Sequence, residues 1–233
     1  PPPYSSAASD VYKRQELGTE ALAAMGAGSR VFFALQAIMM AISAGTTALV
    51  ARAWGAGDYE EASRVTMASM VLAGLLSLLI AVFGIVLASD MAGVFGLDEA
   101  TSDLATRTIQ WLSFFNLAFA VAFVLQAALR ASGDAWTPLW VGIGCNIINL
   151  PLFYAFIFGN WGAPNMGVVG SAVAGGISFA AGSLFMLIMW LRQRFRVRYI
   201  NHGWWRRERL ARLLEIGYPA ALEQGVFQIG FFI

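Results

Sequence analysis

The longest segment without a charged side chain runs from Ala135 to Leu191 and holds 57 residues. A transmembrane helix needs about 20 mostly apolar residues, so this segment is too long for a single span. The stretch FGNWGAPNMG near its middle is rich in Gly, Asn and Pro, which favour a loop. The segment therefore predicts two membrane helices, over about 138–158 and 166–191.

The composition of the whole chain indicates the same environment. Of its 233 residues, 58% are hydrophobic and 12% are charged, against about 45–50% and about 25% in soluble domains. A chain of this size has too little interior to hide so much apolar surface from water, so its solvent is lipid. The single cysteine, Cys145, lies in an apolar run, which excludes a disulfide framework and a Cys-based zinc site.

Three further charge-free runs have the length of a membrane span, namely Val31–Ala51, Val65–Ser89 and Thr108–Leu129, and another apolar run starts near Leu214. We predict an all-α integral membrane protein, a helical bundle with five complete transmembrane helices and the start of a sixth. Residues 1–15 are polar and lack the apolar core of a signal peptide, so we interpret them as a non-native or disordered tail.

Arginines orient the predicted spans, because short basic loops stay on the cytoplasmic side of a membrane. The connections 52–64, 130–137 and 192–213 are basic, and the last holds eight arginines. They are therefore expected in the cytoplasm, and a further helix is expected ahead of Val31. The eight arginines would also suit nucleic acid or acidic lipid, but we favour a topology anchor in which Trp204–Leu214 forms a short amphipathic helix on the membrane surface.

Three motifs follow one another in the order and at the distances found in a known family. TTALVARAWGAGDYEEASR follows the first span, LRASGDAWTPLWVGIGCNIINLPLFYAFIFG joins the third to the fourth, and GAPNMGVVGSAVAGG opens the fifth. From about Leu17 to Ile233 the chain resembles the first half of a multidrug and toxic compound extrusion (MATE) transporter.

The resemblance implies twelve helices in two six-helix lobes. The five complete spans would then be the second to sixth helices of the family. Residues 16–191 would form the first lobe without its first helix, residues 192–213 a basic cytoplasmic linker, and residues 214–233 the truncated first helix of the second lobe.

The motifs also have structural reasons of their own. Tight turns favour glycine, a helix N-cap favours a short polar side chain, the first turn of a helix tolerates proline, and close helix packing in membranes needs small residues. We assign these structural roles to Gly55, Gly57, Asp58, Gly133, Asp134, Pro138, Gly167 and Gly170.

Polar residues inside the charge-free segment point to a functional helix face. Asn146 and Asn149 are three apart, so they share one face of a helix. Pro151 frees the carbonyl of Ile147, which an asparagine nearby can satisfy, and it predicts a kink. The two amides would serve either as interhelical hydrogen bonds or as a polar patch of a central cavity, which Phe153 would extend with an aromatic surface for flat cations.

The resembled family often has Asn and then Asp or Asn four residues later in this helix, as part of a cation or proton site. Asn149 matches the first position, whereas Phe153 at the second can neither bind a cation nor take a proton. Gln36 and Gln126 are further amides within spans, suited to hydrogen bonds between helices or to lining the cavity. Glu223 is the single acid in the apolar stretch IGYPAALEQGVFQ, and the resemblance suggests that it couples transport to an ion.

The function implied by the resemblance is secondary active efflux of organic, often cationic compounds in exchange for protons or sodium ions, by alternating access. No nucleotide motif, catalytic pair or metal-ligand set is found, so we expect no cofactor, no metal and no enzyme activity. We expect small-molecule substrates, membrane lipid and no nucleic acid as partners, a monomer at full length, and the bacterial inner membrane as its location.

Two alternatives remain. A lipid-linked oligosaccharide flippase of the related superfamily should carry arginine or lysine within its spans, and the predicted spans contain neither. A membrane-embedded enzyme would need clustered acids or histidines at one depth, which this half does not show.

Overall fold

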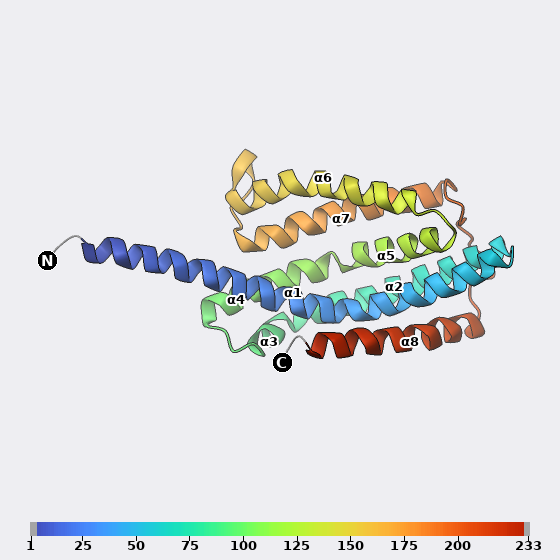
Figure 1. Ribbon diagram of the computed structural model, residues 1–233, viewed down its shortest axis with the longest axis horizontal. Helices are drawn as coiled ribbons and strands as arrows, with labels where there is room; N and C mark the ends of the chain where they lie inside the picture. The colour runs from blue at the N-terminus through green and yellow to red at the C-terminus, as the bar shows by residue number, and fades with distance from the viewer. Residues whose placement is uncertain (1–3, 231–233) are drawn as a thin grey trace.

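The computed structural model describes the backbone of residues 4–230, and the side chains from residue 24 onward except 25, 29, 221, 224, 225 and 227–230 (Figure 1). Within these residues the fold is all-α, with no strand. The elements are α1 (Tyr4–Gly55), α2 (Tyr59–Val86), α3 (Ala88–Gly93), α4 (Glu99–Phe114), α5 (Asn116–Ala131), α6 (Trp136–Phe158), the 3₁₀ turn η1 (Asn160–Gly162), α7 (Val168–Leu191) and α8 (Arg207–Gly230).

Long apolar helices lie side by side and confirm the predicted membrane fold (Figure 1). Four stretches are long and apolar enough to cross a bilayer, and the bent pair α4–α5 makes a fifth. The four are Gly26–Gly55, Tyr59–Val86, Trp136–Phe158 and Val168–Leu191. Their bounds lie within a few residues of the predicted ones at most ends.

The third span differs from its prediction. The sequence predicted one span over Thr108–Leu129. In the structure this span starts at Glu99 and bends by 49° between α4 and α5. Asn116, the first residue of α5, is buried beside the bend. Its Nδ2 donates to the carbonyl of Ser77 on α2 at 3.0 Å, and its Oδ1 accepts from Gln36 Nε2 on α1 at 3.1 Å. The bend thus coincides with an amide that joins three helices.

Small residues set the closest helix contacts. A Cβ atom at Gly45 of α1 would lie 2.7 Å from the carbonyl oxygen of Leu213 on α8, and one at Gly217 of α8 would lie 2.8 Å from that of Ala41 on α1. Gly170 of α7 approaches the Phe156 carbonyl of α6 in the same way, at 2.6 Å. Such close approach is typical of helix pairs in membranes, where packing takes the place of the hydrophobic effect.

The beginning of α8 corrects the predicted surface helix. Residues Trp204–Leu214 do not form a separate amphipathic helix, because α8 runs unbroken from Arg207 to Gly230. Leu213 and Arg209 are both buried against the bundle, so this segment packs on α1 and α2. At the other terminus, α1 includes residues 4–15, which the sequence assigned to a tail; their side chains lie outside the described residues.

The connections separate into two ends of the bundle. The α1–α2 turn, the α5–α6 turn and the segment after α7 lie together at the right of Figure 1, and α3 and the α6–α7 connection lie at the left. The backbone N–H of Arg198 donates to Ser63 Oγ at 3.1 Å, which holds the segment after α7 against α2. The three basic connections therefore share one end, as the arginine distribution requires.

The Asn116 hydrogen bonds lead to the first prediction. Asn116→Leu leaves the buried Gln36 amide without its partner, and a buried unpaired polar group costs about 1–3 kcal/mol. We expect the free energy of unfolding of the detergent-purified full-length protein to fall by about that amount, seen as a lower Tm. Gln36→Leu/Asn116→Leu should recover part of the loss, because it also removes the stranded amide. An unchanged Tm in Asn116→Leu would contradict this role.

Candidate functional site

Two adjoining pockets lie between α1, α5, α6 and α7. One, of about 230 Å³, is lined by α5, α6 and α7; the other, of about 500 Å³, is lined by α1, α5 and α7. They share Ala122, Gln126 and Phe179, so they form one hollow. We call it the amide cavity, because its polar lining includes Gln36, Gln126, Asn146 and Asn149.

The structure thus gathers four of the five side chains assigned to a cavity wall, from three helices far apart in the sequence. Phe153 is the exception: its side chain is exposed and lines neither pocket. The pocket lining on α6 ends at Asn149, one helical turn before Phe153. The predicted aromatic surface is supplied instead by other phenylalanines, which are Phe32, Phe33, Phe119, Phe123 and Phe179.

Among the described residues, the lining of the amide cavity contains no charged side chain. Its phenylalanines contact one another, with ring centroids 4.6 Å apart for Phe119 and Phe179 and 5.1 Å apart for Phe32 and Phe119. A hollow of this kind can hold a flat apolar body between rings and bond its polar groups to amides. It offers no carboxylate to a cation and no guanidinium to an anion.

The four amides are not equivalent. Gln36 donates to Asn116 and so joins helices, and Gln126 Oε1 accepts from Arg130 Nη1 at 3.4 Å. Asn146 Nδ2 donates to its own helix, at the Gly142 carbonyl, at 3.0 Å. Asn149 is half-buried and makes no hydrogen bond within the described part of the chain. Asn149 is therefore the amide most available to a ligand.

Pro151 lies within α6, which continues as one helix through Phe158. The neighbouring Asn146 does not satisfy the Ile147 carbonyl that Pro151 frees, because its amide is bonded to Gly142 instead. Glu223 lies on α8 with an exposed side chain and lines neither pocket of the amide cavity. The structure therefore separates this acid from the amides.

The turn between α1 and α2 follows from its sequence. Gly57 adopts a φ of 77°, a left-handed conformation that favours glycine, while Gly55 is the last residue of α1. Asp58 caps α2, since its Oδ1 accepts from the backbone N–H of Glu61 at 2.9 Å. These contacts fix the start of α2 at the basic end of the bundle.

The turn between α5 and α6 repeats this design. Gly133 has a φ of 84°. Asp134 accepts from the backbone N–H of Thr137 at 3.0 Å and from its hydroxyl at 2.6 Å, and Pro138 is buried in the first turn of α6. Before α7, Gly167 has a φ of 53°. These turns fix where α6 and α7, two walls of the amide cavity, begin.

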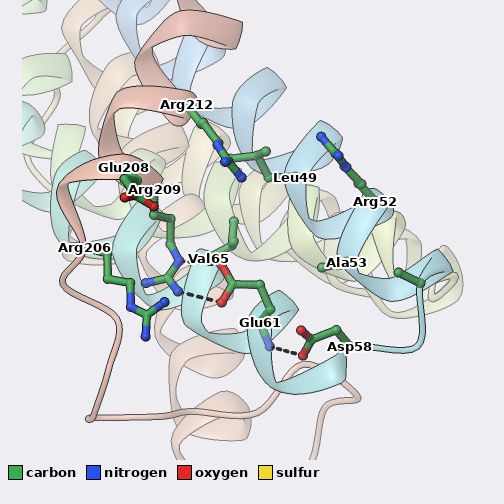
Figure 2. Close-up of a pocket in the computed structure, with 11 residues that line it drawn as sticks. Leu49, Arg52, Ala53, Asp58, Glu61, Val65, Arg206, Glu208, Arg209 and Arg212 are labelled. Atoms are coloured by element: carbon green, nitrogen blue, oxygen red, sulfur yellow. Dashed lines mark hydrogen bonds and ion pairs between the residues drawn. The ribbon is translucent and has the colours of Figure 1, made fainter.

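A buried arginine at the basic end is a feature that sequence analysis missed. Arg209 of α8 is 5% exposed, and its Nε and Nη2 donate to the two carboxylate oxygens of Glu61 on α2 at 2.8 and 2.6 Å. Its Nη1 donates to the carbonyls of Gly203 and Trp204. Figure 2 shows this pair beside a pocket of about 320 Å³, which Arg52, Arg206 and Arg212 also line.

This pair, the Glu61–Arg209 clamp, joins α8 to α2 and holds the chain that precedes α8. The sequence alone assigns no partner to Glu61, and Arg209 is one of eight arginines in 192–213. The available signal was the position of Arg209 one helical turn before Leu213, which is buried.

Comparison with known proteins adds to this geometry. The MatE family model matches residues 4–155. A relative from Thermotoga maritima, named "Probable multidrug resistance protein NorM", is 29% identical over 215 residues, which are 91% of this chain and 46% of the relative. The chain thus spans about half the length of the relatives that it matches.

Two solved structures superpose well on this chain, each at 27% identity. One is described as the outward-facing conformation of a multidrug resistance MATE family transporter of the MOP superfamily; the TM-score is 0.82, with 94% of this chain and 48% of that chain covered. The other is described as the inward-facing conformation of such a transporter; the TM-score is 0.81, with 91% and 48% covered.

The apolar helices and the enclosed amide cavity define a multi-pass helical membrane protein, of a kind found in the bacterial inner membrane. The chain belongs to the MatE family, whose model covers well over half of its residues. The matched relatives and structures are transporters, which argues against a membrane-embedded enzyme.

The Glu61–Arg209 clamp leads to the second prediction. Arg209→Gln should lower the free energy of unfolding by about 1–3 kcal/mol, less than for a fully buried pair because Glu61 is partly exposed. Arg209→Lys should lie in between, since lysine keeps the charge without the bidentate geometry. Arg107→Gln is the control: it removes an exposed pair with Asp103, of a kind worth about 0.3–0.5 kcal/mol. Equal thermal shifts for Arg209→Gln and Arg107→Gln would refute the clamp.

Proposed function

We propose that the full-length protein is a secondary active efflux transporter, which exchanges organic, often cationic compounds for protons or sodium ions. The observation that carries the proposal is the amide cavity, an uncharged hollow of amides and phenylalanines inside a bundle of the MatE family. Such a lining suits amphipathic substrates of varied shape. Relatives named as multidrug resistance proteins support the substrate class.

Alternating access is the proposed mechanism. The chain superposes almost equally well on transporters described as outward-facing and as inward-facing, with TM-scores of 0.82 and 0.81. A unit that fits both states can rock as a body and need not refold, which supports transport by movement of one lobe against another. In this scheme the amide cavity travels with the lobe and opens to each side in turn.

The lining also argues against a flippase for lipid-linked oligosaccharides. An anionic headgroup within the membrane would need arginine or lysine beside it, and the described lining of the amide cavity has neither. The same lining lacks a carboxylate, so the ion that drives transport binds elsewhere, with Glu223 as the acid proposed for this role.

Substrate recognition is tested with Asn149, in the full-length protein reconstituted into vesicles under an ion gradient. Asn149→Leu should raise the KM for fluorescent cations that carry hydrogen-bonding groups by about 5- to 10-fold, since a lost hydrogen bond costs about 1 kcal/mol or slightly more. It should change little for purely aromatic cations. Asn146→Leu is the matched control with a smaller expected effect, because its amide N–H donates to Gly142. If transport of all substrates falls equally and the Tm is lower, Asn149 stabilises the fold and does not recognise substrate.

Ion coupling is tested with Glu223. Glu223→Gln should preserve substrate binding and downhill substrate movement but abolish uphill efflux driven by the gradient, because the amide cannot exchange a proton or balance a cation. Glu215→Gln, on the same helix, is the control and should remain coupled. If Glu223→Gln still transports substrate uphill at the full rate, Glu223 does not take part in coupling.

A further inference from the structure

A second hollow, the α6–α7 groove, lies along these two helices at the basic end of the bundle. It has a volume of about 710 Å³, within the range of about 300–1,000 Å³ typical of ligand sites. Its lining comes from α6, α7 and the two basic connections that adjoin them, and none comes from α1, α2, α4, α5 or α8. Trp140 and Phe185 of its lining are exposed, so the groove is open at the surface of the described bundle.

The floor of the α6–α7 groove is apolar. Gly144 and Ile148 of α6 face Ala181, Phe185 and Met189 of α7 along it. On α6 the lining runs from Thr137 to Ile148, which at about 1.5 Å per residue is about 16 Å. Half of a hydrocarbon core of about 30 Å is about 15 Å. The groove therefore has the depth of one leaflet.

The mouth of the α6–α7 groove is basic. Arg194 and Arg196 line it, both side chains are exposed, and neither forms an ion pair within the described residues. Asp134 also lines this mouth and accepts two hydrogen bonds from Thr137, so the two arginines leave the mouth with a net positive charge. Trp140, 64% exposed, lies between the basic mouth and the apolar floor, where indole rings prefer the membrane interface.

We propose that the α6–α7 groove binds an anionic phospholipid of the leaflet at the basic end. Its phosphate would contact Arg194 and Arg196, its glycerol region would lie beside Trp140, and one acyl chain would follow the apolar floor. The two guanidinium groups without ion-pair partners suit the anionic headgroup, and the apolar floor, which is as long as one leaflet is thick, suits the acyl chain. The amide cavity adjoins this groove, because Val141, Cys145 and Gly182 line both, but Arg194 and Arg196 line the groove and not the cavity.

The test uses native mass spectrometry of the full-length protein in detergent, titrated with phosphatidylglycerol or phosphatidylcholine of the same chain length. Phosphatidylglycerol should bind more tightly, and Arg194→Gln/Arg196→Gln should weaken its binding by about 10- to 30-fold, as expected for two arginines near a charged headgroup. Arg192→Gln/Arg198→Gln is the matched control, with the same charge change in the same segment but outside the groove. Equal weakening by both double variants would overturn the proposal.

A second variant tests the acyl chain. A Cβ atom at Gly144 meets no atom within 4 Å, so Gly144→Leu should fill the groove without a clash. We expect an unchanged Tm and weaker binding of both lipids. Water-soluble glycerol 3-phosphate should not compete with phosphatidylglycerol; effective competition would mean that the arginines bind a free anion, and the lipid proposal would be wrong. Unchanged lipid binding in Gly144→Leu would also refute it.

Discussion

Hydrocarbon offers no hydrogen-bond partner, so a polar side chain that this chain carries into the membrane gains stability from a partner inside the bundle. Asn116 shows how the requirement shapes the fold. Its amide bonds to Gln36 on α1 and to the Ser77 carbonyl on α2, and the third span bends where it enters. The relative positions of α1, α2 and α5 depend on this one side chain. Of these, α1 and α5 carry part of the wall of the amide cavity.

The contacts of α8 obey the same requirement at the basic end. Arg209 is almost fully buried, and each of its three guanidinium nitrogens donates to an oxygen of Glu61, Gly203 or Trp204. Two helical turns further on, glycine lets the backbones of α1 and α8 touch. A buried guanidinium whose three nitrogens all donate, and a close backbone approach at Gly45 and Gly217, together fix α8 on the bundle. Neither contact alone would set both its position and its direction.

Sequence reasoning reached the features that depend on local chemistry. The charge-free runs located the spans, and glycine followed by aspartate located the turns before α2 and α6. It failed where the partner lies far along the chain. Asn116 lies in an apolar run, and the residues next to it do not show whether its amide has a partner on another helix. Arg209 and Glu61 are 148 residues apart, and the exclusion of Phe153 from the cavity depends on where the pocket ends, which helical periodicity does not specify.

The lining of the amide cavity has one more consequence. A carboxamide is donor and acceptor at once, and rotation about its terminal torsion exchanges the two. Asn149 can thus meet an ammonium, a hydroxyl or a carbonyl without any movement of the backbone. Such groups can bond to a hydrogen-bond donor or to an acceptor of a ligand. The phenylalanines around them would then select ligands by shape. A cavity with a fixed backbone can therefore accept ligands of varied chemistry, and it needs no loop that changes conformation for each one.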